Sequence, residues 1–549
     1  MSYALDEIER VEDVRIELDN GAQVALTDEP TFELIRSTRT LGCFQIESPG
    51  QRELLGKFAP ETFDDLIIDI SLFRPGPVAS DMITPFLQAR QGWAPAVYLH
   101  PDLRPILEAT CGVVVFHEQV LRIVSLFAGV SLARADEVRR ALGNRDNFPD
   151  LRAWFYPASF DRGYSLEVVE QVWEVLCAFG SFGFCKAHAA AFALPTFQSA
   201  WLKTHHPAAF LAGVLTHDPG MYPKRVILDD ARQLGIEVLS LDVQVSDRVY
   251  RVEPVGDGFG IRLALSDVAG ISADEVDRII QARPYLDLAD FFLRTKVSRP
   301  VTERLISGGA FDSLHGISLG PLSPGPVVLA QSASITRRDL LLQLADLDQA
   351  TKTTRSRAST GQLSLVAAID PASSLVPTGL PEMTSAESVR AELEILGLDA
   401  SRHVVDFYSA LLDRLNVVRS KDLLTTRSQS HVLVAGVKVS TQTPPVRSGR
   451  RVVFLTMDDS TGPVDVAFFD STSAQTLHQV FSGWLLVIRG VTRRTGPKGI
   501  SIRGLQAWDL TQLYEVYQSE GLGAVLDLLA PEPEVKRYDQ RAKSGTMKP

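Results

Sequence analysis

Two pairs of side chains are placed where they could bind a phosphate. Arg139 and Arg140 lie together near the end of a predicted amphipathic helix at 133–142, and Gly143 follows them. Guanidinium groups make planar, two-point contacts with phosphate oxygens, which a lysine cannot reproduce. The alternative interpretation is an exposed helix end, where cations interact favourably with the helix dipole.

Lys186 and His188 open a second predicted helix, at 187–203, directly after a glycine-rich and aromatic loop at 179–184. A helix N-terminus presents free N–H groups and a positive dipole end, and Lys186 adds a full charge. This combination predicts an anion site. His188 taken alone is more typical of a packing residue.

Acidic residues do not form a recognisable metal-binding pattern. The sequence contains three acidic pairs: Asp64-Asp65, Asp229-Asp230 and Asp458-Asp459. Because Mg²⁺ needs oxygen ligands that converge from a rigid scaffold, we interpret these pairs as solvated faces and turn residues. We therefore predict no catalytic residue and no metal ligand in this chain. The four cysteines lie far apart, without a C-x-x-C pair, which favours reduced thiols and no zinc site.

The elements that position the cationic pairs are helical. Residues 41–222 are dense in apolar positions at three- and four-residue spacing, so they predict one large, mainly helical domain after a lead-in at 1–40. Residues 223–258 predict a small mixed connector, with a helix that ends near 234–235 and short strands after it.

Residues 259–314 predict two short helix-hairpin-helix units with glycine-bearing turns. Such a hairpin points backbone N–H groups at a DNA phosphate without reading sequence. A plain helical connector is the alternative for the first unit alone. The residues predicted to contact DNA here are Val268, Gly270, Ser272 and Gly308.

The remaining sequence divides by composition. Residues 315–390 are rich in Pro, Gly, Ser and Thr, as linkers are, and carry one amphipathic helix at 337–349. A helical connector follows at 391–429. Residues 430–510 alternate like five short strands, which predicts an OB-fold barrel before a helical or mobile tail at 511–549. The fold class is a multidomain, mainly α chain with a C-terminal five-stranded OB-fold β-barrel.

The barrel is basic within an acidic protein. Between His431 and Leu505 there are nine Lys and Arg against four Asp, although the whole chain has a net charge of −12. Basic loops on an OB-fold suit single-stranded nucleic acid. We expect the aromatic residues to fill the small core, so the predicted DNA contacts are charged: Lys438, Arg450, Arg451, Arg493, Arg494 and Lys498.

Bulk properties place the protein in a broad class. A length of 549 residues suggests three or four domains. Hydrophobic content of 45% and charged content of 22% are typical of soluble globular proteins. The N-terminus lacks the apolar stretch of a signal peptide, and no uninterrupted apolar run approaches the roughly 20 residues that span a bilayer. We expect a cytoplasmic protein with no membrane contact.

Five segments of the helical region resemble, in order, the fingers of bacterial DNA polymerase III α subunits. They are GCFQIES at 42–48, LFRPGP at 72–77, FHEQV at 116–120, RRALG at 139–143 and FGFCKAHA at 182–189. Each segment alone is a weak signal, but five in the family's order leave little room for chance. The chain thus resembles the C family of bacterial DNA polymerases. The segment at 215–219, LTHDP, is most similar to the error-prone, damage-associated branch of that family.

This resemblance implies roles for particular residues. Residues 41–222 would be the fingers, and the triphosphate of an incoming dNTP would contact Arg74, Arg139, Arg140, Lys186 and His188. The family's palm carboxylates precede the segment at Gly42, and neither of their motifs occurs in the first 41 residues. We therefore expect the Mg²⁺ ions of catalysis to be held by a palm-bearing chain or by a missing N-terminal segment.

A short peptide in the linker resembles the family's sliding-clamp anchor. In such a peptide the apolar side chains fill a pocket and an amide fixes the register. The predicted clamp-binding residues are Gln362, Leu363 and Leu365.

Two hypotheses of different class follow. In the first, the chain is the fingers, hairpin and OB portion of an error-prone DNA polymerase for translesion or repair synthesis, inactive alone, with primer-template DNA, dNTP and the sliding clamp as partners. In the second, it is a non-catalytic DNA- and clamp-binding module or a degenerate remnant. An adjacent upstream reading frame that encodes the palm carboxylates would favour the first.

Overall fold

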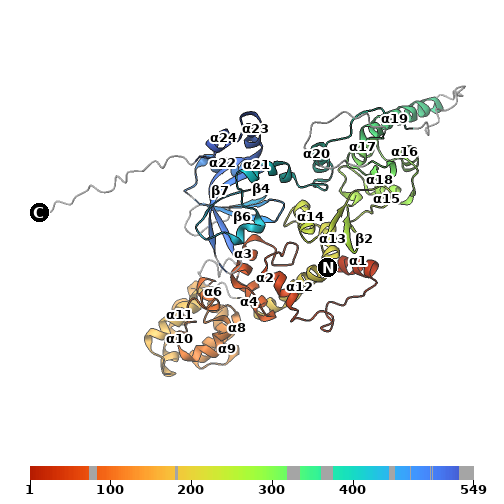
Figure 1. Ribbon diagram of the computed structural model, residues 1–549. Coiled ribbons are helices and arrows are strands. Elements are labelled where there is room, and N and C mark those ends of the chain that lie inside the picture. Colours follow the sequence, from red (N-terminus) through yellow and green to blue (C-terminus); the bar gives the residue numbers. More distant parts are fainter. Residues whose placement is uncertain are drawn as a thin grey trace.

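The computed structural model describes residues 1–72, 83–179, 184–317, 334–359, 375–443, 452–469, 471–494, 496 and 499–530. These residues form a mainly helical chain with one three-stranded sheet and one closed five-stranded barrel, as Figure 1 shows. The predicted fold class is therefore confirmed. Within the described part of the chain, no helix combines the length and apolar composition needed to cross a membrane.

The largest hydrophobic core lies in what we call the main body. Its first helices are α1 (Ser2–Glu12), α2 (Glu29–Arg36), α3 (Pro49–Phe58), α4 (Phe63–Leu72) and α6 (Ile83–Arg90), and it continues with α12 (Lys186–His205), α13 (Pro207–His217) and α14 (Lys224–Gln233). Helix α12 packs on α2 and α4, and α13 packs on α1. Local sequence fixes where helices begin, since the side chain of Ser48 accepts a hydrogen bond from Gln51 N at the start of α3.

A second, smaller core forms a lobe of helices that is set apart from the main body in Figure 1. The lobe contains η1 (Pro101–Leu103), α7 (Arg104–Leu107), η2 (Glu108–Thr110), α8 (His117–Ala128), α9 (Leu132–Ala141), η3 (Arg145–Asn147), α10 (Phe148–Asp161) and α11 (Leu166–Phe179). Phe127, Phe155 and Trp173 pack at its centre. The helices predicted from periodicity are present, but the segment 41–222 divides between two cores.

The hairpin region follows a small sheet in the order β1-β3-β2, made by β1 (Glu237–Leu239), β2 (Arg251–Val255) and β3 (Gly258–Arg262). Its helices are η4 (Leu265–Asp267), α15 (Ala273–Gln281), α16 (Leu288–Thr295), α17 (Arg299–Ser307) and α18 (Asp312–His315). The first predicted hairpin unit thus opens with a three-residue 3₁₀ turn in place of a helix. The reason is burial, because Leu263, Leu265 and Val268 all enter the core directly after β3.

Two helices flank the linker. Helix α19 (Arg337–Ser359) is longer than the 337–349 predicted, and α20 (Ser385–Leu396) starts in a capping box between Thr384 and Glu387. The Thr- and Ser-rich stretch of α19 was interpreted as linker, but it contains no Gly or Pro to interrupt the helix. An ion pair between Lys352 and Asp348 supports it.

The barrel is closed by the strand order β4-β5-β6-β8-β7. The strands are β4 (His431–Gln442), β5 (Val453–Asp458), β6 (Pro463–Phe468), β7 (Leu485–Arg494) and β8 (Ile500–Asp509). Parallel pairing of β6 with β8 completes the closure. The interior is apolar, and η5 (Val404–Tyr408), α21 (Ser409–Arg414), η6 (Ser420–Thr425), α22 (Ala474–Ser482), α23 (Leu510–Glu520) and α24 (Leu522–Leu528) accompany the barrel.

Candidate functional site

The first turn of α8 joins two of the sequence motifs. Phe116 and Phe184 form an isolated parallel bridge, and His117 N donates a hydrogen bond of 2.8 Å to the carbonyl oxygen of Phe184. This contact holds the start of α8, in the lobe, against the start of α12, in the main body. Of the residues predicted to bind a triphosphate, Lys186 and His188 lie on α12 and Arg139 and Arg140 lie on α9.

Arg139 and Arg140 share one carboxylate. Arg139 Nη2 lies 2.9 Å and Arg140 Nη2 lies 2.5 Å from the two carboxylate oxygens of Asp136, one turn earlier on α9. The Arg139 hydrogen bond is the main cause that lowers the pKa of Asp136. Desolvation and then the charge of Arg139 lower the pKa of His117. The Arg140 side chain is nevertheless 73% exposed, so it is accessible to an anion.

Lys186 begins α12, and its backbone amide already has an acidic partner. Both carboxylate oxygens of Glu118 accept from Lys186 N, at 3.0 Å each, so α8 already supplies the negative charge that the helix end attracts. The Lys186 side chain is about half exposed. Its Nζ lies 3.7 Å from Asp64 Oδ1 and 5.8 Å from the centre of the Phe116 ring.

His188 is exposed and is held by aromatic contacts. Its ring lies edge-on to Phe184, at 5.2 Å between centroids, and to Phe192, at 4.5 Å. We call Arg139, Arg140, Lys186 and His188 the cationic cluster. The acidic residues next to this cluster are Glu118 and Asp64, which contact Lys186, and Asp136, which contacts both arginines. They do not form the converging set of carboxylates that Mg²⁺ requires. Arg74 lies outside the described residues.

The predicted hairpin residues differ in exposure: Val268 is buried, Gly270 and Ser272 are exposed, and Gly308 is half-buried. The amide of Ala269 donates to the carbonyl of Ile395 on α20 at 2.8 Å, so this amide does not face outward as predicted. Gly270 has a φ of +76°, and Arg304 lies against the turn, donating to Ala269 O at 2.7 Å. Ser272 caps α15, and Gly308 N donates to Arg304 O.

On the barrel, the predicted DNA-binding charges differ in their surroundings. Lys438 Nζ donates to the carbonyls of Val480 and Phe481, at 3.3 and 2.7 Å. Arg494 donates to Leu424 O, whereas the Arg493 side chain is exposed. Arg450, Arg451 and Lys498 lie outside the described residues, as do Gln362, Leu363 and Leu365 of the linker.

The expectation that the aromatic residues are core holds for Phe468 and is wrong for Phe454 and Phe469, which are 43% and 44% exposed. Phe454 on β5 is the register partner of Ala467 on β6, which in turn is the partner of Arg503 on β8. The Phe454 ring and the exposed Arg503 therefore flank Ala467 on one outer face of the barrel.

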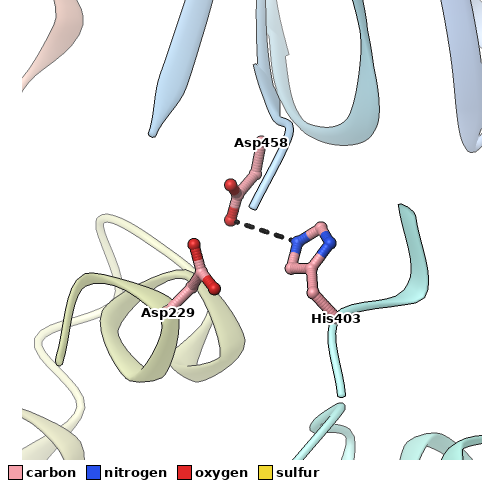
Figure 2. Close-up of side chains that lie close together, drawn as sticks. All are labelled: Asp229, His403 and Asp458. Atoms are coloured by element: carbon pink, nitrogen blue, oxygen red, sulfur yellow. Dashed lines mark ion pairs between the residues drawn. The ribbon is translucent and has the colours of Figure 1, made fainter. Parts of the chain in front are cut away.

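The acidic pairs are mostly buried, which corrects their interpretation as solvated faces. Asp229, Asp230, Asp458 and Asp459 are each at most 4% exposed. Asp230 pairs with Lys203 Nζ at 2.6 Å, and Asp459 accepts from Ser420 N. Asp229 and Asp458 approach His403, which the sequence gave no reason to select, as Figure 2 shows.

Comparisons with known proteins agree with this architecture. The bacterial DNA polymerase III alpha subunit finger domain matches residues 1–157, a helix-hairpin-helix motif matches 235–317, and an OB-fold nucleic acid binding domain matches 432–510. These three matches follow the order of the helical region, the hairpin region and the barrel along the chain.

Curated relatives are similar to most of this chain. The chain is 31% identical to an error-prone DNA polymerase of Symbiobacterium thermophilum, over 89% of this chain and 47% of the relative. It is 32% identical to one of Nocardia farcinica, over 85% and 39%. It is 29% identical to a DNA polymerase III subunit alpha of Pseudomonas aeruginosa, over 89% and 43%. Over most of its own length the chain is thus similar to bacterial DNA polymerase III α subunits and error-prone DNA polymerases, and it spans less than half the length of these curated relatives.

Proposed function

We propose that this chain is the nucleotide-gripping and DNA-guiding part of an error-prone DNA-directed DNA polymerase. The observation that carries the proposal is that cations from two helices approach the first turn of α8: the charge of Arg139 on α9 acts on His117, and Lys186 Nζ on α12 lies 5.8 Å from the centre of the Phe116 ring. A dNTP triphosphate would replace Asp136 and Asp64 as the partner of these cations. Each exchange substitutes a phosphate oxygen for a carboxylate oxygen, so no buried charge is created.

The catalytic metal belongs to other residues. Mg²⁺ supplies activation of the primer 3′-oxygen and neutralisation of the leaving pyrophosphate when it is bound. We propose that palm carboxylates outside this chain hold it, because the carboxylates of the cluster are already engaged by Arg139, Lys186 and the α12 backbone. The cluster positions the triphosphate and balances its charge.

Single-stranded template DNA would bind the outer face of the barrel. We propose that a base of single-stranded DNA stacks on Phe454 while Arg503 contacts the adjacent phosphate, since aromatic platforms beside cations bind single strands without sequence preference. The hairpin region would contact the duplex, and Gln362, Leu363 and Leu365 would bind the sliding clamp.

The triphosphate assignment is tested by primer extension in a mixture of this chain with a palm-bearing polypeptide of the family. Arg139→Ala/Arg140→Ala should lower kcat/KM for dNTP on the order of 100-fold, because two charge-assisted contacts to phosphate are lost. Binding to primed DNA should stay unchanged. Arg134→Ala is the matched control, since Arg134 lies on the same helix and pairs with Glu137 instead.

Three results would contradict the proposal. Unchanged kcat/KM for dNTP in the double variant would mean that Arg139 and Arg140 do not contact the triphosphate. Extension of primers by the chain unaided would contradict the external palm. Binding of primed DNA without any extension in the mixture would favour the alternative, a DNA- and clamp-binding module without catalysis.

The single-strand assignment is tested separately. Phe454→Ala should weaken binding of a fluorescein-labelled oligo-dT about 10-fold, because base stacking on an aromatic ring contributes about 1–3 kcal/mol per base. Fluorescence anisotropy measures the affinity. Phe481→Ala, which removes a similarly exposed ring from α22, should leave it unchanged. Equal losses in both variants would reject the Phe454 platform.

A further inference from the structure

Three elements from distant parts of the chain meet between the main body and the barrel. Asp229 comes from α14, His403 precedes η5, and Asp458 ends β5. One ligand-type atom from each lies within 4.8 Å of the others, and all three residues are at most 3% exposed. Figure 2 shows their side chains directed at one another. We call this group the acidic junction.

Two atoms of the junction lack hydrogen-bond partners among the described residues. They are His403 Nε2 and Asp458 Oδ2, which lie 3.7 Å apart. That separation is too long for a hydrogen bond, and a buried polar atom left without one is costly. The two atoms form an ion pair, which Figure 2 marks with a dashed line, but no hydrogen bond, so both can still take a ligand placed between them.

The other atoms of these side chains are already fixed. Asp458 Oδ1 accepts from Ser460 N at 3.2 Å, and His403 Nδ1 accepts from Val405 N at 3.2 Å. Asp229 Oδ2 accepts from Gln233 Nε2 at 2.7 Å. Close backbone packing also holds Asp458, because a Cβ on Gly436 would lie 2.6 Å from the Asp458 carbonyl oxygen. The three side chains are thus held in orientation before any ligand arrives.

The arginines near the junction do not hydrogen-bond its carboxylates. Arg225 Nη2 donates to the backbone oxygen of Lys438. Arg232 lies 3.6 Å from Asp229 Oδ1 but donates to the backbone oxygens of Asp399 and Ala400. The coordinating capacity of the buried carboxylates is therefore not used up by these two guanidinium groups.

We propose that Asp229, His403 and Asp458 bind one divalent transition-metal ion with the ligand preferences of zinc, which fastens the barrel to α14. An imidazole nitrogen beside two carboxylate oxygens suits such an ion, whereas Mg²⁺ and Ca²⁺ prefer oxygen alone. Ligand atoms about 2.0–2.2 Å from zinc lie about 3.3 Å apart in a tetrahedron. The 3.7 Å between His403 Nε2 and Asp458 Oδ2 is close to this spacing, and the three ligand atoms, which lie within 4.8 Å of one another, would draw together around the ion.

The structure also suggests a fourth ligand and a tautomer for His403. Asp399 Oδ1 is buried and also lacks a hydrogen-bond partner among the described residues, so it or a water molecule would complete the coordination. A neutral imidazole whose Nδ1 accepts from Val405 N carries its proton on Nε2. Metal binding at Nε2 moves that proton to Nδ1 and gives up the Val405 contact. No proton is gained or lost overall.

The ion would have a structural role. Besides the junction, the main body meets the barrel through polar contacts such as Arg52 with Asp465, at 3.1 Å, and Arg225 with Lys438 O, also at 3.1 Å. A metal at the junction would link α14, His403 and β5 by coordination bonds. This assignment does not depend on the triphosphate role of the cationic cluster.

The test uses the full chain, freed of metal with EDTA and titrated with Co²⁺ as a spectroscopic probe. We expect one Co²⁺ per chain with d–d absorption bands, and at least a 10-fold loss of affinity in His403→Gln and Asp458→Asn. Loss of a residue that only hydrogen-bonds to a metal ligand can change the metal affinity by about 10–100-fold, and removal of a ligand itself should have at least as large an effect. His478→Gln, at an exposed histidine of the same barrel, should bind like the unmodified chain. Unchanged Co²⁺ binding in the junction variants, or no binding to the unmodified chain, would overturn the proposal.

A second measurement needs no variant and so holds even if the substitutions prevent folding. X-ray absorption of the Zn²⁺-loaded chain should show one imidazole and otherwise oxygen ligands. Sulfur in the coordination shell would place the ion at the cysteines instead, and a spectrum without imidazole would exclude His403. Either result rejects the site.

Discussion

The cationic cluster and the acidic junction handle charge in opposite ways. In the cluster each acidic neighbour already contacts a cation or an amide, and Arg140 and Lys186 remain open to solvent. In the junction, Asp229, His403 and Asp458 are buried with unpaired atoms facing one another. Water screens the first set, so its partners can be exchanged cheaply, whereas the second set requires full compensation inside the protein. An exposed set of charges suits a ligand that comes and goes, and a buried set suits one that stays.

The largest effect should come from a buried charge that has lost its partner. Lys203→Met leaves the carboxylate of Asp230, 2.6 Å from Lys203 Nζ, buried without a cation and removes a hydrogen bond to Leu41 O. We expect a loss of about 3–5 kcal/mol in the free energy of unfolding, measured by urea titration. The double variant Lys203→Met/Asp230→Leu should recover most of it. A loss below about 1 kcal/mol in the single variant would show that burial of Asp230 without a cation costs little free energy of unfolding.

A buried carboxylate with enough donors should behave differently from Asp229. Glu275 accepts from Ser272 N, Ser272 Oγ and Ser298 N. Although burial raises the pKa of Glu275, these bonds outweigh it and lower the pKa to about 2. Because the folded-state pKa is depressed, the stabilisation is complete above the unfolded value of 4.5 and disappears as pH falls toward 2.

Glu275→Gln should therefore destabilise the protein by about 1–2 kcal/mol at pH 7, after allowance for solvent screening of the carboxylate. The difference in unfolding free energy from the unmodified chain should shrink as the pH falls from 4.5 toward 2. Denaturant titrations at several pH values provide the measurement. A difference that is constant over this range would mean that the charge of Glu275 is not what stabilises the hairpin region.

The smallest effect should come from the exposed cluster. Arg140→Ala removes a contact to Asp136 that is open to solvent, so the free energy of unfolding should change by less than about 0.5 kcal/mol. Thermal unfolding of the variant beside the unmodified chain measures this. A clear destabilisation would mean that Arg140 supports the lobe structurally, and its kinetic effect could then not be assigned to nucleotide contact.

Local patterns predicted the elements well. Helices α9 and α12 lie within two residues of the bounds expected from apolar spacing, and the region 430–510 contains the five strands that alternation indicated. Alternation also contained the signal that Phe454 faces outward, because Val453 and Leu455 on either side of it face the core. That signal was outweighed by the assumption that a small barrel needs its aromatic residues inside.

Long-range contacts limited the prediction of the site. Asp229 lies more than 150 residues before both His403 and Asp458 in the sequence. No local window of sequence can therefore show that these residues meet and become buried. Glu118 fills the N-terminus of α12 from another helix, so the helix end looked open when only its own residues were considered. His403 stands in no motif, and only its three-dimensional neighbours distinguish it.

The bridge between Phe116 and Phe184 has a mechanical consequence. Arg139 belongs to a helix packed in the lobe core, whereas Lys186 belongs to one packed in the main body, and the bridge joins the two units beside both residues. A ligand that contacts residues of both units at once would fix the orientation of the lobe relative to the main body. Part of its intrinsic affinity would then be used to fix that orientation, so the length of the ligand would itself be selected.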